Sequence, residues 1–172
     1  EAKRIINSYR NTHNCMPYLW EKANQAIQAL ANGQSMVVDV PGLVRVEPGK
    51  GLTLPSGLHI QYPGLRREYN DDKKPEWRYT TKGMPTRVYG GLCVENFTQA
   101  IARCVVAEQL LRIRKRYPVV LTVHDSVICI APMDQAEHAM EYVIECMSWN
   151  PKWSTGLPLA CEGGFSDVYG DC

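Results

Sequence analysis

The sequence lacks any uninterrupted apolar run long enough to cross a bilayer, and it does not open with a secretory signal. The first absence argues against a membrane-spanning segment within these residues. With 172 residues, 45% of them hydrophobic, the chain is long enough for one domain with an apolar core. It opens on Glu1 rather than Met, so we expect it to be a piece of a longer protein.

Paired cysteine motifs are also missing. The seven cysteines are an odd number, and no two have the C-x-x-C spacing. Several lie in apolar surroundings, as Cys104 and Cys129 do. This usage favours buried, reduced thiols in a cytoplasmic protein over a disulfide framework or a zinc site.

Charge is unevenly distributed although the net value is only +1. Residues 1–133 carry eighteen Lys and Arg against eleven Asp and Glu, a net of +7, whereas residues 134–172 carry one against seven, a net of −6. A basic face that meets a polyanion would give this asymmetry, and so would two ordinary solvated faces.

The first half of the chain changes from a helical to a strand-like pattern. Residues 1–33 predict two helices or one kinked helix, interrupted near Pro17 and ending at Gly33. Their apolar positions are Ile5, Ile6, Tyr9, Trp20, Ala23, Ile27 and Leu30. Residues 34–92 contain short β-prone pieces between Pro-Gly, Pro-Ser-Gly and Asn-Asp-Asp turns, which predicts hairpins with "YNDDKKP" as an exposed tip.

The second half begins with a predicted helix from about Glu95 to Arg114. Its inward positions are Phe97, Ile101, Val105 and Leu111, and its polar face holds Glu95, Asn96, Gln99 and Arg103. A later helix is predicted to begin with Asp134 and Glu137 in capping-box positions. Its apolar stripe comprises Ala136, Met140, Val143, Ile144 and Met147. The apolar stretch "LPLACEGG" is predicted to be an edge or closing strand.

Between these helices lies "LTVHDSVICIAP", in which two β-branched runs, 119–123 and 127–131, flank His124, Asp125 and Ser126. The pattern predicts a hairpin whose tip displays the polar triplet, because a carboxylate inside a central strand would be costly to desolvate. A rigidly held carboxylate suits Mg²⁺, which demands near-octahedral oxygen ligands. An Asx-type turn, in which Asp125 bonds its own backbone, is the alternative interpretation.

Other chemistries fit the sequence less well. Adjacent His, Asp and Ser residues do not form a hydrolase triad, which needs side chains that converge from separate elements. A phosphohydrolase built on a His-Asp pair would need further histidines in helices, and His13, His59 and His138 have no second ligand beside them. Metal-dependent phosphoryl transfer through Asp125 remains.

The segment "VVLTVHDSVICIAP" resembles the third catalytic motif of the family A (DNA polymerase I-like) DNA polymerases, a hairpin that displays His-Asp-Glu. "YGGLCVENFTQAIARCVVAEQLL" resembles the long palm helix before it in phage-encoded members, and "LPSGLHIQYPG" resembles the hairpin between the fingers and that helix. "LPLACEGGFSDVYGDC" and "EAKRIINSYRNTHNCMPYLWEKANQAI" are similar to the C-terminal segment and to the helix after the fingers.

The resemblance implies an α+β fold: an antiparallel palm sheet with the catalytic hairpin, packed on helices, plus an inserted β-hairpin region. Residues 1–33 would be the helical segment after the fingers and 34–92 the β-hairpin insertion. Residues 93–172 would hold the palm helix, catalytic hairpin and C-terminal segment.

The resemblance also implies site residues and partners. Asp125 would be one of two aspartates that coordinate a pair of catalytic Mg²⁺ ions, and His124 would lie beside the primer terminus. Gln99 and Asn96 would approach the minor groove of the nascent base pair, and Arg103 would meet phosphate. For the basic run 112–116, helix-end solvation is the alternative to phosphate contact. The implied partners are primer-template DNA, deoxynucleotides and the rest of the parent chain, in a bacterial host cytoplasm.

Two departures from the family pattern matter. Ser126 stands where glutamate is usual, and the motif with the partner aspartate and the nucleotide-binding fingers helix are absent from the sequence. We therefore expect the isolated chain to be inactive, and either to self-associate through the strand edge that the missing motif would cover or to be poorly soluble. Two alternatives remain: a non-catalytic module that binds duplex nucleic acid, and a structural subunit of a split polymerase.

Overall fold

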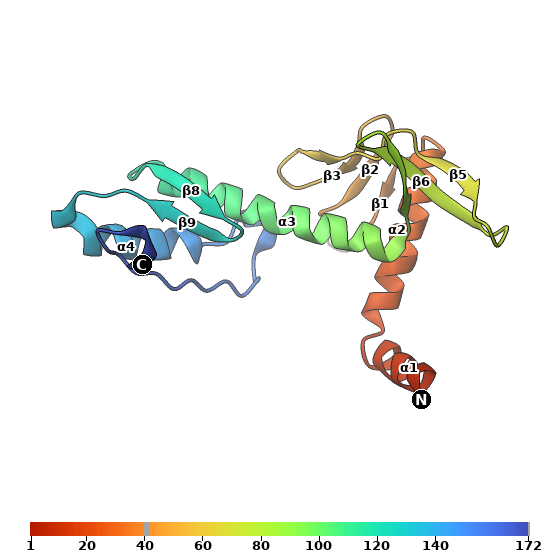
Figure 1. Ribbon diagram of the computed structural model, residues 1–172, viewed down its shortest axis with the longest axis horizontal. Coiled ribbons are helices and arrows are strands. Elements are labelled where there is room, and N and C mark those ends of the chain that lie inside the picture. Colours follow the sequence, from red (N-terminus) through yellow and green to blue (C-terminus); the bar gives the residue numbers. More distant parts are fainter. Residues whose placement is uncertain (40–41, 172) are drawn as a thin grey trace. The chain divides into compact units, whose positions relative to one another are not determined.

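The computed structural model describes residues 1–39 and 42–171, which divide into two compact units, Glu1–Ile101 and Ala102–Cys172. The described residues form four α-helices and three small antiparallel sheets (Figure 1). The predicted α+β class is confirmed. The strands form three separate sheets, and the hairpin that carries Asp125 is a two-stranded sheet of its own. The palm assignment and its domain bounds stay predictions. Within the described ranges, no helix combines the length and the apolar character that a bilayer crossing needs.

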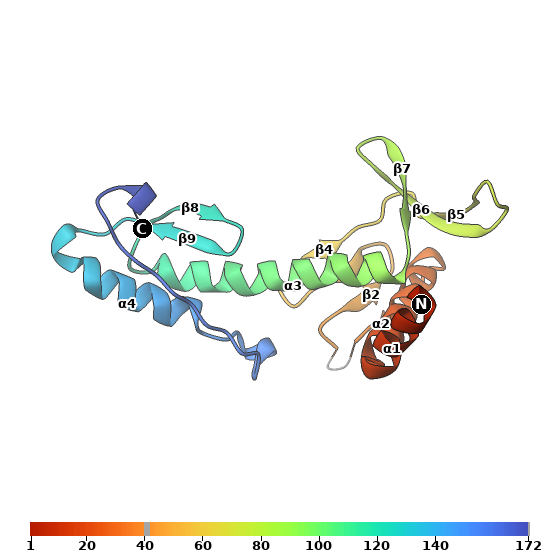
Figure 2. The same ribbon diagram turned by 60° about the horizontal axis from the view of Figure 1, so that its bottom comes forward.

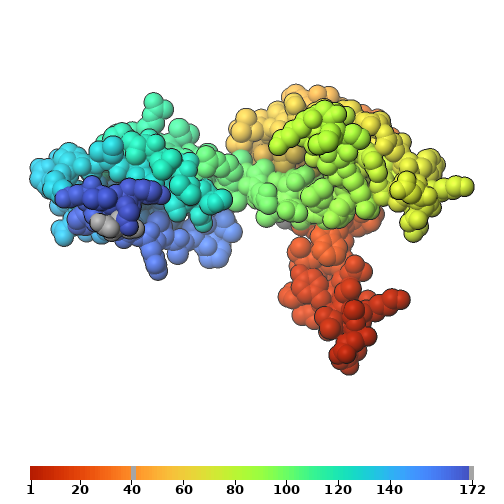
Figure 3. Space-filling view, in the orientation of Figure 1, coloured from red at the N-terminus to blue at the C-terminus, as the bar shows by residue number. Residues whose placement is uncertain are grey.

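Two helices open the first unit, as predicted. Helix α1 (Ala2–Thr12) and helix α2 (Cys15–Ala31) are separated at residues 13–14, so the break precedes Pro17, which lies in the first turn of α2. Proline is tolerated there because the first amides of a helix have no intrahelical acceptor. Helix α1 buries no residue, and Ile5 is 60% exposed, so its apolar face has no cover; Figure 3 shows it extending from the rest of the unit.

Helix α2 packs on the first sheet, whose order is β1-β2-β3-β4. The strands are β1 (Met36–Val37), β2 (Arg45–Glu47), β3 (Gly51–Thr53) and β4 (His59–Ile60). Fully buried side chains from both layers form the core of this unit, among them Ile27 of α2, Val46 of β2 and Leu52 of β3. The predicted inward positions Ala23 and Ile27 are confirmed.

The second sheet, β5-β6-β7, completes the strand-rich region that was predicted over residues 34–92. Its strands are β5 (Arg66–Tyr69), β6 (Pro75–Thr81) and β7 (Met84–Val88). The tip between β5 and β6 is exposed from residue 71 to residue 75, as predicted for "YNDDKKP". A hydrogen bond from Lys74 N to Asn70 Oδ1, 2.8 Å long, closes this turn.

Helix α3 (Gly90–Ile113) begins five residues before the predicted start. Phe97 and Val105 are buried as expected, but Leu111 is 62% exposed, so its inward prediction was wrong. The buried positions near the helix end are Gln109 and Ile113. Leu111 lies two residues from each of them, which places it on the opposite side of a helix with 3.6 residues per turn.

The second unit contains strands β8 (Val119–Val123) and β9 (Ser126–Cys129), followed by helix α4 (Ala136–Met147). Short 3₁₀ turns cover Met133–Gln135, Lys152–Ser154 and Tyr169–Asp171. The predicted capping box was wrong: the N-cap of α4 is Gln135, without a side-chain cap bond, because a 3₁₀ turn precedes the helix.

The strand predicted for "LPLACEGG" was also wrong. Residues 157–164 are irregular, and they run beside α4 (Figure 2). A Cβ built on Gly163 would lie 3.5 Å from the Ile144 side chain, so the segment packs closely on the helix. Its apolar residues are used to cover α4 rather than to extend a sheet.

The start of α3 provides a matched stability test. Gly90 N donates to Asn24 Oδ1 over 2.6 Å, and a Cβ at Gly90 would overlap the carbonyl oxygen of Trp20. A Cβ at Gly91 would meet the Tyr89 ring, which is half exposed and can move, and would be in ordinary contact with Trp20 Nε1 at 4.0 Å. Gly90→Ala should therefore lower the free energy of unfolding by about 2 kcal/mol or more, whereas Gly91→Ala should change it by less than about 1 kcal/mol. Urea unfolding measures both, and equal losses would contradict the close approach of α2 and α3.

Candidate functional site

The predicted hairpin exists, and its tip is tighter than expected. The ladder pairs Val123 with Ser126, so the loop consists of His124 and Asp125 alone, and Ser126 is the first residue of β9. His124 has a φ of +54°. Two-residue hairpin loops need a positive φ at their first position, and histidine is one of the few residues besides glycine that adopts it with some frequency.

Asp125 is exposed, and its carboxylate has no hydrogen bond or ion pair with any residue that the structure describes. The Asx-turn interpretation is therefore not what the structure contains, because the carboxylate accepts nothing from the backbone. His124 and Ser126 are exposed beside it. The ladder below fixes the backbone of the tip, so both oxygens of Asp125 stand free on a positioned strand end.

A single carboxylate does not make a metal centre. No group of three or more His, Cys, Asp or Glu side chains in residues 1–39 and 42–171 could hold a metal ion. Asp125 suits one oxygen ligand of Mg²⁺, and the remaining ligands would have to come from elsewhere.

A largely apolar groove of about 910 Å³ lies beside the hairpin within the second unit. Its walls come from the hairpin, from α3 and α4 and from the C-terminal segment; Asp125 and Ser126 contribute to the lining. The half-buried stripe of α4 lines it too: Met140, Val143, Ile144 and Met147. The predicted stripe thus faces a groove rather than a filled core.

The buried Gln109 fixes the frame around this groove. Its side chain is 2% exposed, and Nε2 donates to the carbonyl oxygens of Met147 at 2.6 Å and Trp149 at 3.1 Å. Sequence reasoning missed it, although Val105, Gln109 and Ile113 recur at four-residue spacing and so share one inward face. A polar residue on such a face signals a buried hydrogen-bond acceptor from another element.

The basic run at the end of α3 is held by aromatic rings. The Arg112 guanidinium lies 4.4 Å from the Trp149 ring centroid, and the Arg116 guanidinium lies 4.8 Å from that of Tyr142. Tyr142 also donates its hydroxyl to the Arg112 carbonyl oxygen over 2.9 Å. These contacts favour a structural interpretation of residues 112–116 over phosphate binding.

The other predicted residues lie along α3, at three- and four-residue spacing on one face. Gln99 and Arg103 are exposed, and Gln99 Nε2 lies 3.5 Å from Glu95 Oε1. Asn96 is half-buried, and its Nδ2 donates to the Tyr62 hydroxyl over 3.1 Å. Asn96 and Gln99 belong to the first unit, whereas Arg103 and the hairpin tip belong to the second.

Tyr62 is a second residue that sequence reasoning missed. Burial raises its pKa, and burial also raises the pKa of the neighbouring Cys93 thiol to about 11, so both groups are neutral near neutral pH. The Tyr62 hydroxyl therefore holds the Asn96 amide in one orientation, as an uncharged acceptor.

The groove frame can be tested at Gln109. Gln109→Leu removes the amide and leaves two carbonyl oxygens without their donor, which should lower the free energy of unfolding by about 2 kcal/mol. Gln28 is exposed on α2, so Gln28→Leu is the matched control and should change stability by less than about 0.5 kcal/mol. Trp149 and Trp153 allow fluorescence-detected urea unfolding of the second unit. Equal urea midpoints for the two variants would refute the stabilising role of the two Gln109 hydrogen bonds.

Comparison with known proteins gives one informative match. The chain is 32% identical over 124 residues to the DNA polymerase of Bacillus phage SP02. The alignment covers 67% of this chain and 19% of that polymerase, so the chain corresponds to about a fifth of the relative's length. No family model matches the chain. No solved structure matches it. The chain is therefore related in sequence to a phage DNA polymerase.

Proposed function

We propose that this chain is the C-terminal palm portion of a family A DNA polymerase, an enzyme that extends a primer on a template by nucleotidyl transfer. The observation that carries the proposal is the free carboxylate of Asp125 at a rigid two-residue hairpin tip. The similarity to a DNA polymerase supports the same reading. The proposed setting is the cytoplasm, with deoxynucleotides and primer-template DNA as substrates.

Asp125 would supply one oxygen ligand to catalytic Mg²⁺, and a second aspartate would come from the rest of the parent chain. Bound magnesium would stabilise negative charge on the attacking 3′-oxygen and on the leaving pyrophosphate. The hairpin ladder keeps Asp125 in place, and His124 beside it would contact the primer terminus. Ser126 lies in β9 and cannot supply a carboxylate.

Residues on α3 would monitor the new base pair. Gln99 has an exposed amide, and the Asn96 amide is oriented by Tyr62, so both can present polar atoms to the minor groove. Every base pair offers acceptors there, so contacts of this type respond to shape rather than to sequence. Exposed Arg103 would contact phosphate.

The central test replaces one oxygen of the carboxylate. In the complete polymerase, Asp125→Asn should slow primer extension by orders of magnitude and leave primer-template affinity almost unchanged, because the amide keeps the shape and loses the charge. Asp134→Asn, at another exposed aspartate of the same unit, is the matched control and should extend normally. A loss below about tenfold, or 1.4 kcal/mol in barrier, would reject Asp125 as a metal ligand. The 172-residue chain alone should not extend primers, because the described residues contain no group of three or more side chains that could hold a metal ion.

A second prediction concerns the sheet edge. Strands β8 and β9 pair only with each other in the described chain, and Val120, Leu121 and Val123 are exposed. Uncovered β-branched edges pair with other chains, so the isolated chain should self-associate. A lysine on an edge strand opposes such pairing, so Leu121→Lys should shift sedimentation toward monomer. Leu111→Lys, at an exposed leucine of helix α3, is the control and should leave the sedimentation unchanged. A wild-type chain that stays monomeric across a wide concentration range would contradict the prediction.

A further inference from the structure

Three arginines form one row across the β5-β6-β7 sheet. The register pairs Arg66 with Arg78 and Arg78 with Arg87, so the three side chains leave adjacent strands on the same face. Neighbouring strands lie 4.7–4.9 Å apart, so the row spans about 10 Å. Like charges placed directly opposite each other repel, and such a row therefore needs compensation.

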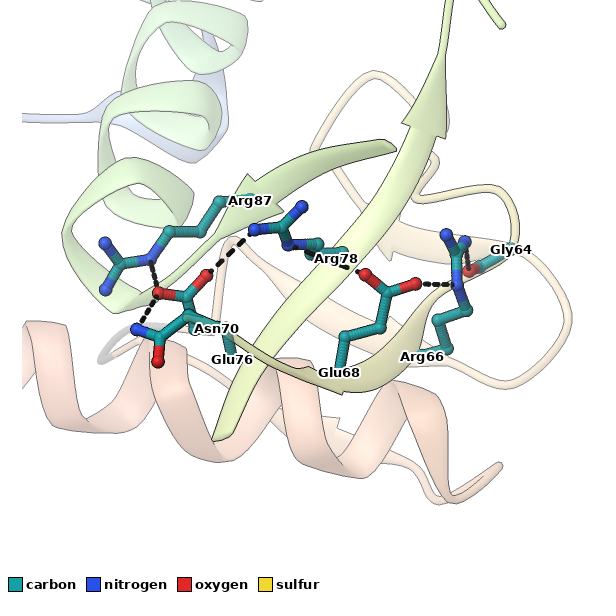
Figure 4. A network of polar contacts seen from close by, with 7 residues as sticks. All are labelled: Gly64, Arg66, Glu68, Asn70, Glu76, Arg78 and Arg87. Atoms are coloured by element: carbon teal, nitrogen blue, oxygen red, sulfur yellow. Dashed lines mark hydrogen bonds and ion pairs between the residues drawn. The ribbon is translucent and has the colours of Figure 1, made fainter. Parts of the chain in front are cut away.

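Two glutamates on the same face hold the row in place (Figure 4). Glu68 lies 2.6 Å from Arg66 Nε and 3.6 Å from Arg78 Nε. Glu76 lies 3.5 Å from Arg78 Nη2 and 3.6 Å from Arg87 Nε, and it also accepts from Asn70 Nδ2 at 2.9 Å. Each carboxylate thus bridges two neighbouring guanidinium groups.

The opposite face of the sheet is turned toward the protein. Trp77 and Tyr79 alternate with Arg78 along β6 and are half-buried, and Val88 of β7 is fully buried. The Tyr79 ring packs edge-on against the ring of Tyr62, with centroids 5.0 Å apart. The arginine face therefore points to solvent, where the side chains of Arg66, Arg78 and Arg87 are 45%, 32% and 59% exposed.

The five charged side chains of this face keep a net positive charge and free N–H donors. Three guanidinium groups against two carboxylates leave one net positive charge, and each guanidinium carries five N–H donors. Around them, residues 64–89 carry seven Lys and Arg against four Asp and Glu, a net of +3. The terminal nitrogens of Arg87 make no hydrogen bond with the described residues.

Stability does not account for the whole row. Glu76 is only 10% exposed, and its ion pairs with Arg78 and Arg87 help to hold the sheet. The exposed pair of Arg66 and Glu68 contributes little to folding, and threonine or valine would form the sheet at least as well there. Ion pairs that fix the rotamers of arginine instead lower the entropy cost of binding an external anion. Each planar guanidinium group matches phosphate oxygens through paired N–H donors.

We propose that the face formed by Arg66, Arg78 and Arg87 binds the phosphate backbone of duplex DNA. Only the choice of DNA as the polyanion rests on the proposed polymerase function. The site is separate in sequence from Asp125 and from the α3 residues. It would anchor the duplex without reading the base sequence, because contacts to phosphate carry no sequence information.

The test uses the 172-residue chain and a short fluorescein-labelled DNA duplex, with anisotropy titrations at several salt concentrations. Arg66→Gln/Arg87→Gln removes the two more exposed arginines of the row. The matched control, Arg4→Gln/Arg67→Gln, removes the same charge from α1 and from the opposite face of β5. Circular dichroism checks the fold, and Arg66→Lys/Arg87→Lys keeps the charge.

Each neutralised phosphate contributes about 0.9 to the slope of log affinity against log salt. The row variant should therefore lose about 1.8 of slope and bind roughly tenfold more weakly, whereas the control should stay near wild type and the lysine pair should keep the slope. Equal losses in the two glutamine variants, or no duplex binding by the wild-type chain, would overturn the proposal. The assay measures duplex binding and needs no primer extension, so the DNA-binding face and the catalytic assignment can fail separately.

Discussion

The amide of Gln109 joins the two helices of the second unit, and the position of the hairpin that carries Asp125 depends on it. Its two hydrogen bonds end on the carbonyl oxygens of Met147 and Trp149, at the end of α4 and just beyond it. The hairpin begins six residues after the end of α3, and α4 follows it closely. A clamp between α3 and the end of α4 therefore fixes both chain ends of the hairpin. Trp153, which donates to Glu108 over 2.6 Å, and Tyr142, which donates to the Arg112 carbonyl, reinforce the same joint.

With its base fixed, the hairpin can carry a polar tip on an apolar body. Asp125 and His124 occupy the two loop positions, where no ladder hydrogen bond is lost and solvent still reaches the carboxylate. The apolar side chains of both strands remain partly uncovered, and the neighbouring groove is lined by apolar residues of α4. Exposed apolar surface of this extent is typical of a contact surface for another chain segment. The free carboxylate and the uncovered strand edge are both features that a contact with another chain segment would use.

The sequence predicted those elements whose signal is local. The hairpin was located because a polar interruption between two β-branched runs can only be accommodated at a turn, and the loop came out one residue shorter because Ser126 pairs with Val123. Long-range features were not predictable in the same way. The inward face of α3 near Gln109 depends on carbonyl groups 38 and 40 residues away, and residues 157–164 pack on α4. An apolar stretch carries the same pattern whether it joins a ladder or covers a helix.

The arginine row shows a similar limit in the electrostatics. Summed along the chain, the basic excess of residues 1–133 does not distinguish a solvated surface from a binding face. Register adds what the sum lacks, because it brings Arg66, Arg78 and Arg87 together although they are twelve and nine residues apart in sequence. The same register places Glu68 opposite Glu76, so that each anion lies between two cations. A charge pattern that depends on strand pairing can only be recognised once the pairing is known, and here it concentrates positive charge on a face that the fold itself leaves open.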